Sequence, residues 1–316
     1  MQDETLKDAR PGTVLAHLSD PHLPLAAGVA LRAVLNKRLL SLLSWRLKRH
    51  RRHLWTVLDP LIADLRAHAP GAIAVTGDLT NLGLDDEYRR ARAWLDTVGE
   101  AARVMVIPGN HDALISGAWE AGAARWHPYW QGDEAHETDV GRAFPWLRRR
   151  GGMALIGLSS AVASRPGLAV GAVGATQRAR LATLLARTRA EGLARVVMVH
   201  HPPLDGTVTA RKRLRDAAEL RAVLAHEGVE MVLHGHSHRS HMQALETTDG
   251  PAPVIGVPSA SSMHLEAAAY NLYRIVTVAG GLRIDLTTRR MTPEGAMETG
   301  DSQRLTLARA HIAGGV

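Results

Sequence analysis

Short apolar runs that each end in a few polar residues recur along this chain, and they constrain its fold more than any other feature. The runs cover residues 13–18, 72–75, 104–107, 153–158, 195–199 and 231–233. Each has the length of a buried strand and is too short for an ordinary helix. Segments with helical patterns lie between them, at residues 31–69, 85–98, 176–191 and 215–226. Alternation of strand, polar loop and helix predicts an α/β fold in which helices flank the sheets.

The rest of the chain is less regular. Residues 242–289 contain short alternating strands and turns rich in Gly and Pro, with little helix. Residues 291–316 are polar and weakly patterned, so we expect a loose C-terminal tail there. The sequence shows neither an internal repeat nor a low-complexity linker. We therefore expect a single domain over residues 1–290.

The chain contains no cysteine, which excludes disulfides, thiolate metal sites and a cysteine nucleophile. Any bound metal must therefore be held by histidine and by oxygen ligands. The first residues have neither the basic start nor the apolar core of a signal peptide, and no apolar run has the length of a bilayer span. We expect a cytoplasmic protein.

Residues of metal-ligand type stand at five of the strand ends. They are Asp20 with His22, Asp78, Asn110 with His111 and Asp112, His200, and His236 with His238. In α/β folds the loops at strand ends gather at one edge of a sheet, so these side chains are expected to converge. Residues that flank one position point the same way on an extended chain, so Asp20 and His22 can hold one ion together. Such ligands suit Mn, Fe, Zn or Co, and a carboxylate such as Asp78 can bridge two ions.

In their order along the chain, these motifs resemble those of the calcineurin-like metallophosphoesterases. The motifs read Asp-Pro-His at 20–22, Gly-Asp at 77–78, Gly-Asn-His-Asp at 109–112, Val-His-His-Pro at 199–202 and Gly-His-Ser-His at 235–238. The resemblance extends over residues 14–259, most of the chain. It implies a four-layer αββα sandwich of two mixed β-sheets flanked by helices. Within the superfamily, the motifs are most similar to those of bacterial cyclic nucleotide and glycerophosphodiester phosphodiesterases.

The resemblance also implies a role for each residue. One divalent ion would be held by Asp20, His22, Asp78 and His238. The second would be held by Asp78, Asn110, His200 and His236, with Asp78 bridging the two ions. A hydroxide between the ions would attack phosphorus, while His111 would face the phosphate and assist the leaving group. Asp112 would orient His111.

The other histidines are expected to have structural or surface positions. We expect His17 to be a core residue or to support a ligand, His234 to be structural, and His201 either to pack in the interior or to touch substrate. The remaining histidines, His50 and His53 among them, are expected on the surface.

A basic helical insert at about residues 28–58 follows the first motif. No carboxylate occurs between Asp20 and Asp59, whereas Arg and Lys recur over residues 32–52 beside Leu and Trp. This composition is typical of a helix on an anionic membrane surface, and equally of an amphipathic helix packed on its own domain with a solvated basic face. The insert therefore predicts either peripheral attachment to the inner membrane or ordinary packing.

An aromatic-rich segment over residues 118–147 follows the third motif. It holds half of the aromatic residues of the chain, namely Trp119, Trp126, Tyr129, Trp130, Phe144 and Trp146. We interpret it as a lid that grips the leaving group, with a small satellite core as the alternative.

These features together predict a metal-dependent phosphoesterase, and most simply a phosphodiesterase that acts on a small phosphodiester. The alternative is a hydrolase of phospholipid headgroups or lipid-linked diphosphates at the membrane surface, which the basic insert favours. A nuclease would suit the formal charge of +7, but the chain has no strand-tracking or base-reading motif, so nucleic acid is not an expected partner. The complete ligand set argues against a non-catalytic scaffold. The sequence indicates no oligomeric state.

Overall fold

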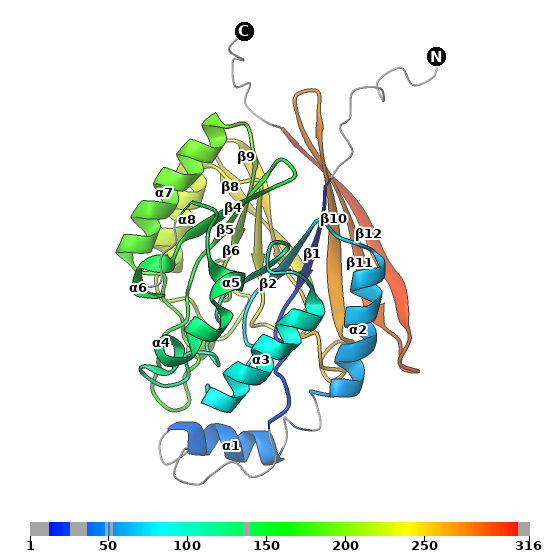
Figure 1. Ribbon diagram of the computed structural model, residues 1–316. Coiled ribbons are helices and arrows are strands. Elements are labelled where there is room, and N and C mark those ends of the chain that lie inside the picture. Colours follow the sequence, from blue (N-terminus) through cyan, green and yellow to red (C-terminus); the bar gives the residue numbers. More distant parts are fainter. Residues whose placement is uncertain (1–12, 26–36, 48–49, 51–52, 135–139, 309–316) are drawn as a thin grey trace.

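Two mixed β-sheets form the centre of the molecule, and helices cover their outer faces (Figure 1). The computed structural model describes residues 13–25, 37–47, 50, 53–134 and 140–308, and the following statements concern these residues. Apolar side chains of both sheets, such as Leu15 of one and Leu155 of the other, belong to one buried cluster. The predicted four-layer αββα sandwich is therefore confirmed.

The first sheet has the strand order β12-β11-β10-β1-β2-β3. Its strands are β1 (Thr13–Leu18), β2 (Ala72–Val75), β3 (Val104–Val106), β10 (Ala269–Val278), β11 (Gly281–Met291) and β12 (Met297–Ala308). β1 pairs in parallel with β2, and β2 pairs in parallel with β3. β10 pairs with β1 in the antiparallel sense and begins an antiparallel meander with β11 and β12. The carboxyl ends of β1, β2 and β3 therefore share one edge of the sheet.

The second sheet has the strand order β4-β5-β6-β7-β9-β8. Its strands are β4 (Trp146–Arg150), β5 (Met153–Gly157), β6 (Ala194–Met198), β7 (Met231–His234), β8 (His241–Thr247) and β9 (Gly250–Gly256). β5, β6, β7 and β9 are parallel, and the antiparallel strands β4 and β8 form the two edges. The carboxyl ends of β6 and β7 therefore also lie together.

The long helices lie on the outer faces of the sheets. α2 packs on β10, β11 and β12, whereas α7 packs on β5 and β6 and α8 on β8. The helices are α1 (Lys37–Leu47), α2 (Trp55–Ala67), α3 (Asp85–Val98), α4 (Ala118–Ala123), α5 (His127–Trp130), α6 (Val140–Ala143), α7 (Ala175–Ala190) and α8 (Ala217–Glu227), with short 3-10 helices η3 (Ala124–Trp126) and η4 (Ala210–Lys212). Of the predicted insert, residues 28–36, 48–49 and 51–52 lie outside the described residues, and α1 and α2 account for most of the rest.

The start of α3 is held by a buried carboxylate. Glu87 accepts hydrogen bonds from the backbone N–H groups of Asn81 (2.6 Å), Leu82 (3.0 Å) and Leu84 (3.0 Å). These donors precede the first helical turn, where backbone N–H groups have no partner within the helix. Burial raises the pKa of Glu87, and the three N–H groups oppose that rise. The arrangement fixes the loop that runs from β2 to α3.

The C-terminal tail expected over residues 291–316 is in large part a strand. β12 pairs with β11 along nearly its whole length. Met297, Leu305 and Leu307 pack against the core, whereas most other side chains of β12 are exposed. An edge strand with one solvated face carries few apolar residues, which is why its composition resembles that of a tail. Residues 309–316 lie outside the described residues.

The aromatic-rich segment is part of the core, which corrects its interpretation as a lid. All six of its aromatic side chains are buried, and they belong to the main hydrophobic cluster rather than to a satellite. The rings of Trp119 and Trp126 pack at 6.5 Å and 5.0 Å from the ring of Tyr88 in α3. These large apolar surfaces are covered by α3 and the sheet, so they are not available to a leaving group. Residues 135–139 of the segment lie outside the described residues.

Candidate metal centre

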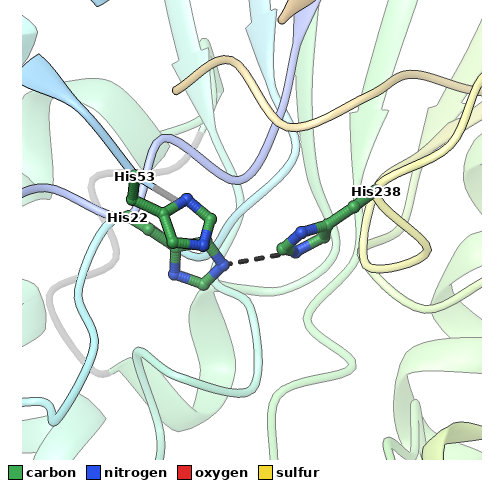
Figure 2. A group of neighbouring side chains, drawn as sticks. All are labelled: His22, His53 and His238. Atoms are coloured by element: carbon green, nitrogen blue, oxygen red, sulfur yellow. Dashed lines mark hydrogen bonds between the residues drawn. The ribbon is translucent and has the colours of Figure 1, made fainter. Parts of the chain in front are cut away.

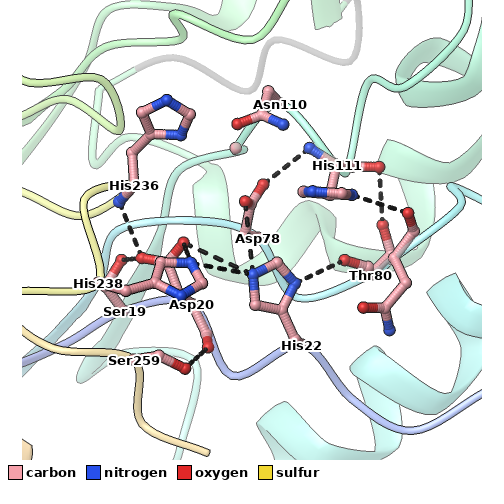
Figure 3. A network of polar contacts seen from close by, with 12 residues as sticks. Ser19, Asp20, His22, Asp78, Thr80, Asn110, His111, His236, His238 and Ser259 are labelled. Carbon is pink, nitrogen blue, oxygen red and sulfur yellow. Dashed lines mark hydrogen bonds and ion pairs between the residues drawn. The ribbon is translucent and has the colours of Figure 1, made fainter. Parts of the chain in front are cut away.

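The loops that follow β1, β2, β3, β6 and β7 converge on one buried cluster of polar side chains, most of which Figure 3 labels. The backbone N–H of His236 donates to Oδ2 of Asp20 at 2.9 Å, which joins the loop after β7 to the loop after β1. Backbone hydrogen bonds from Asp20 to Gly77 and from His22 to Asp78, both 3.0 Å, tie the loops after β1 and β2 together. The structure thus brings together Asp20, His22, Asp78, Asn110, His200, His236 and His238.

Four of these side chains form a first ligand group. Nε2 of His22 lies 3.8 Å from Oδ1 of Asp20 and 3.7 Å from Oδ2 of Asp78. Nε2 of His238 lies 3.3 Å from the same His22 nitrogen and 3.1 Å from Oδ1 of Asp20. Ligand atoms that bind one ion at about 2.1 Å are separated by about 3–4 Å. The spacing therefore suits a single divalent ion.

A second ligand group shares Asp78 with the first. Nε2 of His200 lies 3.5 Å from Oδ2 of Asp78 and 3.3 Å from Oδ1 of Asn110. His236 completes this group, because its ligand atom lies within 4.8 Å of those of Asp78 and His200. Oδ2 of Asp78 is thus 3.7 Å from His22 on one side and 3.5 Å from His200 on the other. This is the position that a bridging carboxylate requires.

Most of the candidate ligands project from a left-handed backbone. The angle φ is 52° at Asp20, 40° at His22, 57° at Asp78, 66° at His236 and 55° at His238. Among the described non-glycine residues, Ala69 alone shares this property. Such conformations cost about 1–3 kcal/mol each and persist only where the surrounding structure imposes them. Their concentration here indicates that the loops are shaped to aim these side chains at a common centre.

Carbonyl groups outside the cluster orient its imidazole rings. Nδ1 of His200 lies 2.7 Å from the carbonyl oxygen of Thr76. In His236, by contrast, Nε2 is the nitrogen that contacts a carbonyl oxygen, that of Lys212, at 2.9 Å. Metal-binding histidines commonly donate their second ring N–H to such an oxygen, which fixes the tautomer and the ring orientation. Nε2 of His200 and Nδ1 of His236 are therefore the nitrogens that serve the cluster.

The charges in the cluster fit cations. Burial raises the pKa of Asp20, but the charges of His238 and His200 lower it more, so this pKa lies well below its usual range. Burial also raises the pKa of Asp78, and the charges of His200 and His111 again outweigh it. Oδ1 of Asp20 is buried and lies 3.1 Å from Nε2 of His238. Two ionised carboxylates buried among imidazole rings need compensating positive charge, so the donor set fits a pair of divalent cations.

Asp112 holds the loops beneath the cluster and does not orient His111. Its carboxylate accepts hydrogen bonds from the backbone N–H groups of Gly109 (2.8 Å), Asp78 (2.9 Å) and Thr80 (2.9 Å). Nδ1 of His111 instead lies 2.8 Å from the carbonyl oxygen of Asn81. The prediction that Asp112 orients His111 is therefore wrong. Asp112 fastens the loop after β3 to the loop after β2, and Asn81 orients the His111 ring.

Two further histidines that follow or precede the ligands are structural. Nδ1 of His201 lies 2.8 Å from Oγ of Ser160, and burial lowers the pKa of His201 to about 3. Nε2 of His17 lies 2.9 Å from Oγ1 of Thr76, and burial lowers its pKa to about 3 as well. Both rings are fully buried, so His201 packs in the interior. His234, buried in β7, behaves as predicted.

His53 is the residue beside the cluster that the sequence interpretation missed. The sequence predicted a surface position for His53, but this residue is only 5% exposed. Its ring centroid lies 4.5 Å from that of His22. It follows a run of basic residues rather than an apolar strand, so none of the signals that identified the other ligands precedes it. His50, the neighbouring histidine, is exposed as predicted.

A cavity of about 600 Å³ opens above the cluster. Asp78, Asn110, His111, His236 and His238 form part of its wall. Three cationic side chains also line it, Lys37 of α1 and Arg211 and Lys212 of η4. The six aromatic residues of the segment 118–147 are not among the described residues that line it. The cavity therefore offers a polar, positively charged surface beside the cluster.

Solved structures with the same fold include phosphatases. A dimetal phosphatase from Danio rerio matches with a TM-score of 0.59 and 14% identity, over 95% of this chain and 100% of that one. A purple acid phosphatase from yellow lupin matches with a TM-score of 0.56 and 12% identity, over 93% of this chain and 53% of that one. At these identities the likeness concerns the fold alone.

Curated relatives are nearer in sequence. A probable cyclic nucleotide phosphodiesterase from Rhodococcus erythropolis is 30% identical over 241 residues, which cover 73% of this chain and 66% of that protein. A cAMP/cGMP dual specificity phosphodiesterase from Mycobacterium tuberculosis is 28% identical over 220 residues, 68% of this chain and 59% of that one. The chain thus spans less than two thirds of the length of each of these relatives.

The family comparison covers the part of the chain that carries all seven candidate ligands. The sequence model described as calcineurin-like phosphoesterase matches residues 13–240, well over half of the chain. These residues contain every strand end that contributes to the cluster, from β1 to β7. The chain belongs to the calcineurin-like phosphoesterase family.

Proposed function

We propose that this chain is a phosphodiesterase that holds two divalent metal ions and hydrolyses a small phosphodiester of the cyclic nucleotide or glycerophosphodiester type. The observation that carries the proposal is the position of Asp78, whose Oδ2 lies between Nε2 of His22 and Nε2 of His200. One ion would be held by Asp20, His22, Asp78 and His238, and the other by Asp78, Asn110, His200 and His236. The ions are drawn from Mn, Fe, Zn and Co, which suit nitrogen and oxygen ligands.

The chain's own residues would position the substrate and move one proton. When bound, the two cations supply positive charge that lowers the pKa of water and stabilises negative charge on the phosphoryl oxygens. The attacking water would release one proton to solvent, its oxygen would form the new bond to phosphorus, and the bond from phosphorus to the leaving oxygen would break. His111 lines the cavity, and the Asn81 carbonyl engages Nδ1 at 2.8 Å. This orientation assigns to Nε2 the proton that passes to the leaving oxygen.

The shape and charge of the cavity support a small anionic substrate. Its volume of about 600 Å³ lies within the usual range for sites that bind small molecules. Lys37, Arg211 and Lys212 would attract a phosphodiester and contact its non-reacting groups. Two relatives are named as cyclic nucleotide phosphodiesterases, which supports the diester over the monoester.

A substrate screen of the manganese-loaded chain tests the proposal. It compares bis(p-nitrophenyl) phosphate, p-nitrophenyl phosphate, cyclic AMP and GMP, glycerophosphocholine and a phospholipid. We expect turnover of the bis-ester and of at least one cyclic nucleotide or glycerophosphodiester. The Asp78→Asn variant, which loses the charge shared by both groups, is expected to be inactive on all of them. Turnover of the monoester alone would contradict the diesterase assignment.

The outward face of α1 supports a second proposal, that this helix docks on an anionic lipid surface. Leu39, Leu43 and Leu47 recur at intervals of four and are 36%, 46% and 71% exposed. Leu42 and Trp45 of the same helix are buried and pack α1 on the domain, so the exposed leucines are not needed for that packing. Basic residues surround this stripe in the sequence, without a carboxylate, which complements acidic headgroups. Within the described part of the chain, no helix is long and apolar enough to cross a membrane.

Sedimentation with lipid vesicles tests this docking surface. The chain should co-sediment with vesicles that contain phosphatidylglycerol and not with vesicles of phosphatidylcholine alone. Leu43→Gln with Leu47→Gln should weaken that binding, whereas Met242→Gln, at a 37% exposed residue on β8, should not. Equal binding of all variants would contradict the proposal. Turnover of the phospholipid in the preceding screen would extend it to hydrolysis of lipid headgroups.

A further inference from the structure

His53 lies in the wall of the cavity, next to the first ligand group. It is supplied by the short segment between α1 and α2, outside the motifs that provide the other candidate ligands. His22, His53 and His238 each place one ring nitrogen within 4.8 Å of the other two. Figure 2 shows one nitrogen of the His53 ring on the side that faces His22 and His238. Two donors on opposite sides of one ion are about 4.2 Å apart when each bond is about 2.1 Å, so a small adjustment places all three on one ion.

The surroundings of His53 match those of the other candidate ligands. Nδ1 of His53 lies 2.9 Å from Oγ of Ser261, as Nδ1 of His200 lies 2.7 Å from the carbonyl oxygen of Thr76. Engagement of one ring nitrogen by a protein oxygen is the usual arrangement for a histidine that binds metal through the other nitrogen.

The backbone around His53 is fixed to the rest of the site. His53 forms an isolated β-bridge with Ser262, and the N–H of Leu54 donates to the carbonyl oxygen of Ser261 at 2.9 Å. The ring also stacks on Trp45 of α1, with centroids 6.2 Å apart and an interplanar angle of 11°. The side chain therefore has a defined place beside the cluster rather than an incidental one.

From this geometry we propose that His53 is a further ligand of the first metal ion, in addition to Asp20, His22, Asp78 and His238. The inference rests on the proposed function, since it requires that ion to bind. Five protein ligands exceed the four of a tetrahedral site, so the first position would take a five- or six-coordinate divalent ion such as Mn²⁺ or Fe²⁺.

Metal titration of the full chain tests the inference. The protein is stripped with a chelator and titrated with Mn²⁺ by calorimetry, and bound metal is counted by mass spectrometry. The wild type should bind two equivalents. His53→Ala should weaken one equivalent by about tenfold or more and leave the other unchanged. The matched control is His264→Ala, at an exposed histidine that lines the same cavity but lies outside the ligand groups.

A spectroscopic measurement separates a ligand from a substrate contact. With Co²⁺ in place of Mn²⁺, the visible absorption bands of the bound ion should change in His53→Ala and not in His264→Ala. His53→Gln, which is closer in volume, gives the same readouts if the alanine variant does not fold. Two unchanged equivalents and unchanged bands, with a change in KM alone, would overturn the inference while leaving the proposed function intact. A wild-type chain that binds fewer than two equivalents would overturn both.

Discussion

At the residue scale, the candidate site depends on a few side chains whose neighbours fix their roles. Asp78 is shared by two ligand groups, and Asp112 holds the loops that carry them. His111 belongs to neither ligand group, although its backbone N–H donates to Asp78, and its ring lines the cavity wall and is oriented by the Asn81 carbonyl. These positions separate residues that would hold metal from one that would act on substrate.

His111→Ala is therefore expected to retain two metal equivalents while kcat falls by about 10²–10⁴-fold, the range for loss of a general acid. The loss should be smaller for bis(p-nitrophenyl) phosphate than for a diester with an alkyl leaving group, because p-nitrophenolate departs without a proton. Steady-state kinetics on both substrates, with metal analysis, provide the check. Full activity on the alkyl diester would exclude this role for His111.

The candidate ligands could be predicted from the sequence because each follows a strand and belongs to a short motif. Asp20 and His238 could be identified in this way, since buried apolar runs precede them. His53 could not, because a basic segment precedes it and only the fold brings it against His22. The partner of His111 was also hidden, since the Asn81 backbone carbonyl leaves no signature in side-chain chemistry.

At the element scale, buried polar side chains connect segments that hydrophobic patterning alone would not join. Arg148 of β4 is 4% exposed and donates to four backbone carbonyl groups, those of Ala101, Val104, Pro128 and Gln131. Burial lowers the pKa of Arg148 to about 10, with the charge of Arg150 acting in the same direction. The strand was not predicted, because three consecutive arginines obscure its apolar residues.

Arg148→Leu should lower the free energy of unfolding by about 3 kcal/mol or more, because several buried carbonyl groups lose their donor. Arg149→Leu is the matched control on the same strand. Its side chain is 30% exposed and pairs with Glu134 and Glu191, so we expect a loss of about 1 kcal/mol or less. Urea denaturation of both variants measures the difference, and equal losses would contradict this account of β4.

Asp64 gives α2 a pH-dependent attachment to the first sheet. Its carboxylate accepts hydrogen bonds from the hydroxyl of Tyr270 (2.6 Å) and from Arg289 (2.7 and 2.9 Å). Burial raises the pKa of Asp64, but these two donors lower it more, so the folded-state pKa lies below its ordinary value. A depressed carboxyl pKa contributes stability above the ordinary pKa of aspartate, and that contribution is lost as the pH falls through the folded-state pKa.

Asp64→Asn should therefore reduce the free energy of unfolding by about 1–3 kcal/mol at pH 7 and by progressively less in acid. Denaturation curves recorded from pH 7 down to pH 3 would show the two proteins approaching one another. Asp59→Asn, at an exposed position of the same helix, should give no comparable trend. A difference that stays constant with pH would argue against the ion pair.

At the scale of the whole molecule, the cluster lies where the two sheets meet. Asp20, His22, Asp78 and Asn110 follow strands of the first sheet, and His200, His236 and His238 follow strands of the second. The four-layer fold could be predicted because strand and helix patterns alternate clearly. The strand β12 could not, because most of its side chains face solvent and only pairing with β11 makes it a strand.

Metal removal should therefore destabilise the molecule as a unit. Each ion at a concentration one hundred times its Kd would add about 2.7 kcal/mol to the free energy of unfolding. We expect the midpoint of thermal unfolding to fall in a chelator and to recover when Mn²⁺ is restored. In Asp78→Asn the chelator should lower the midpoint of thermal unfolding much less. A fall equal to that of the wild type would contradict the shared role of Asp78.

The distribution of the ligands between distant parts of the polypeptide has a further consequence. A chain divided at the turn between α7 and β6, near Gly192, would leave Asp20, His22, Asp78 and Asn110 on one fragment and His200, His236 and His238 on the other. Bound cations would then help to hold the two fragments together, because each ion would take ligands from both. Reassembly of such a divided enzyme should consequently depend on metal concentration, so the pair of fragments would report free divalent ions.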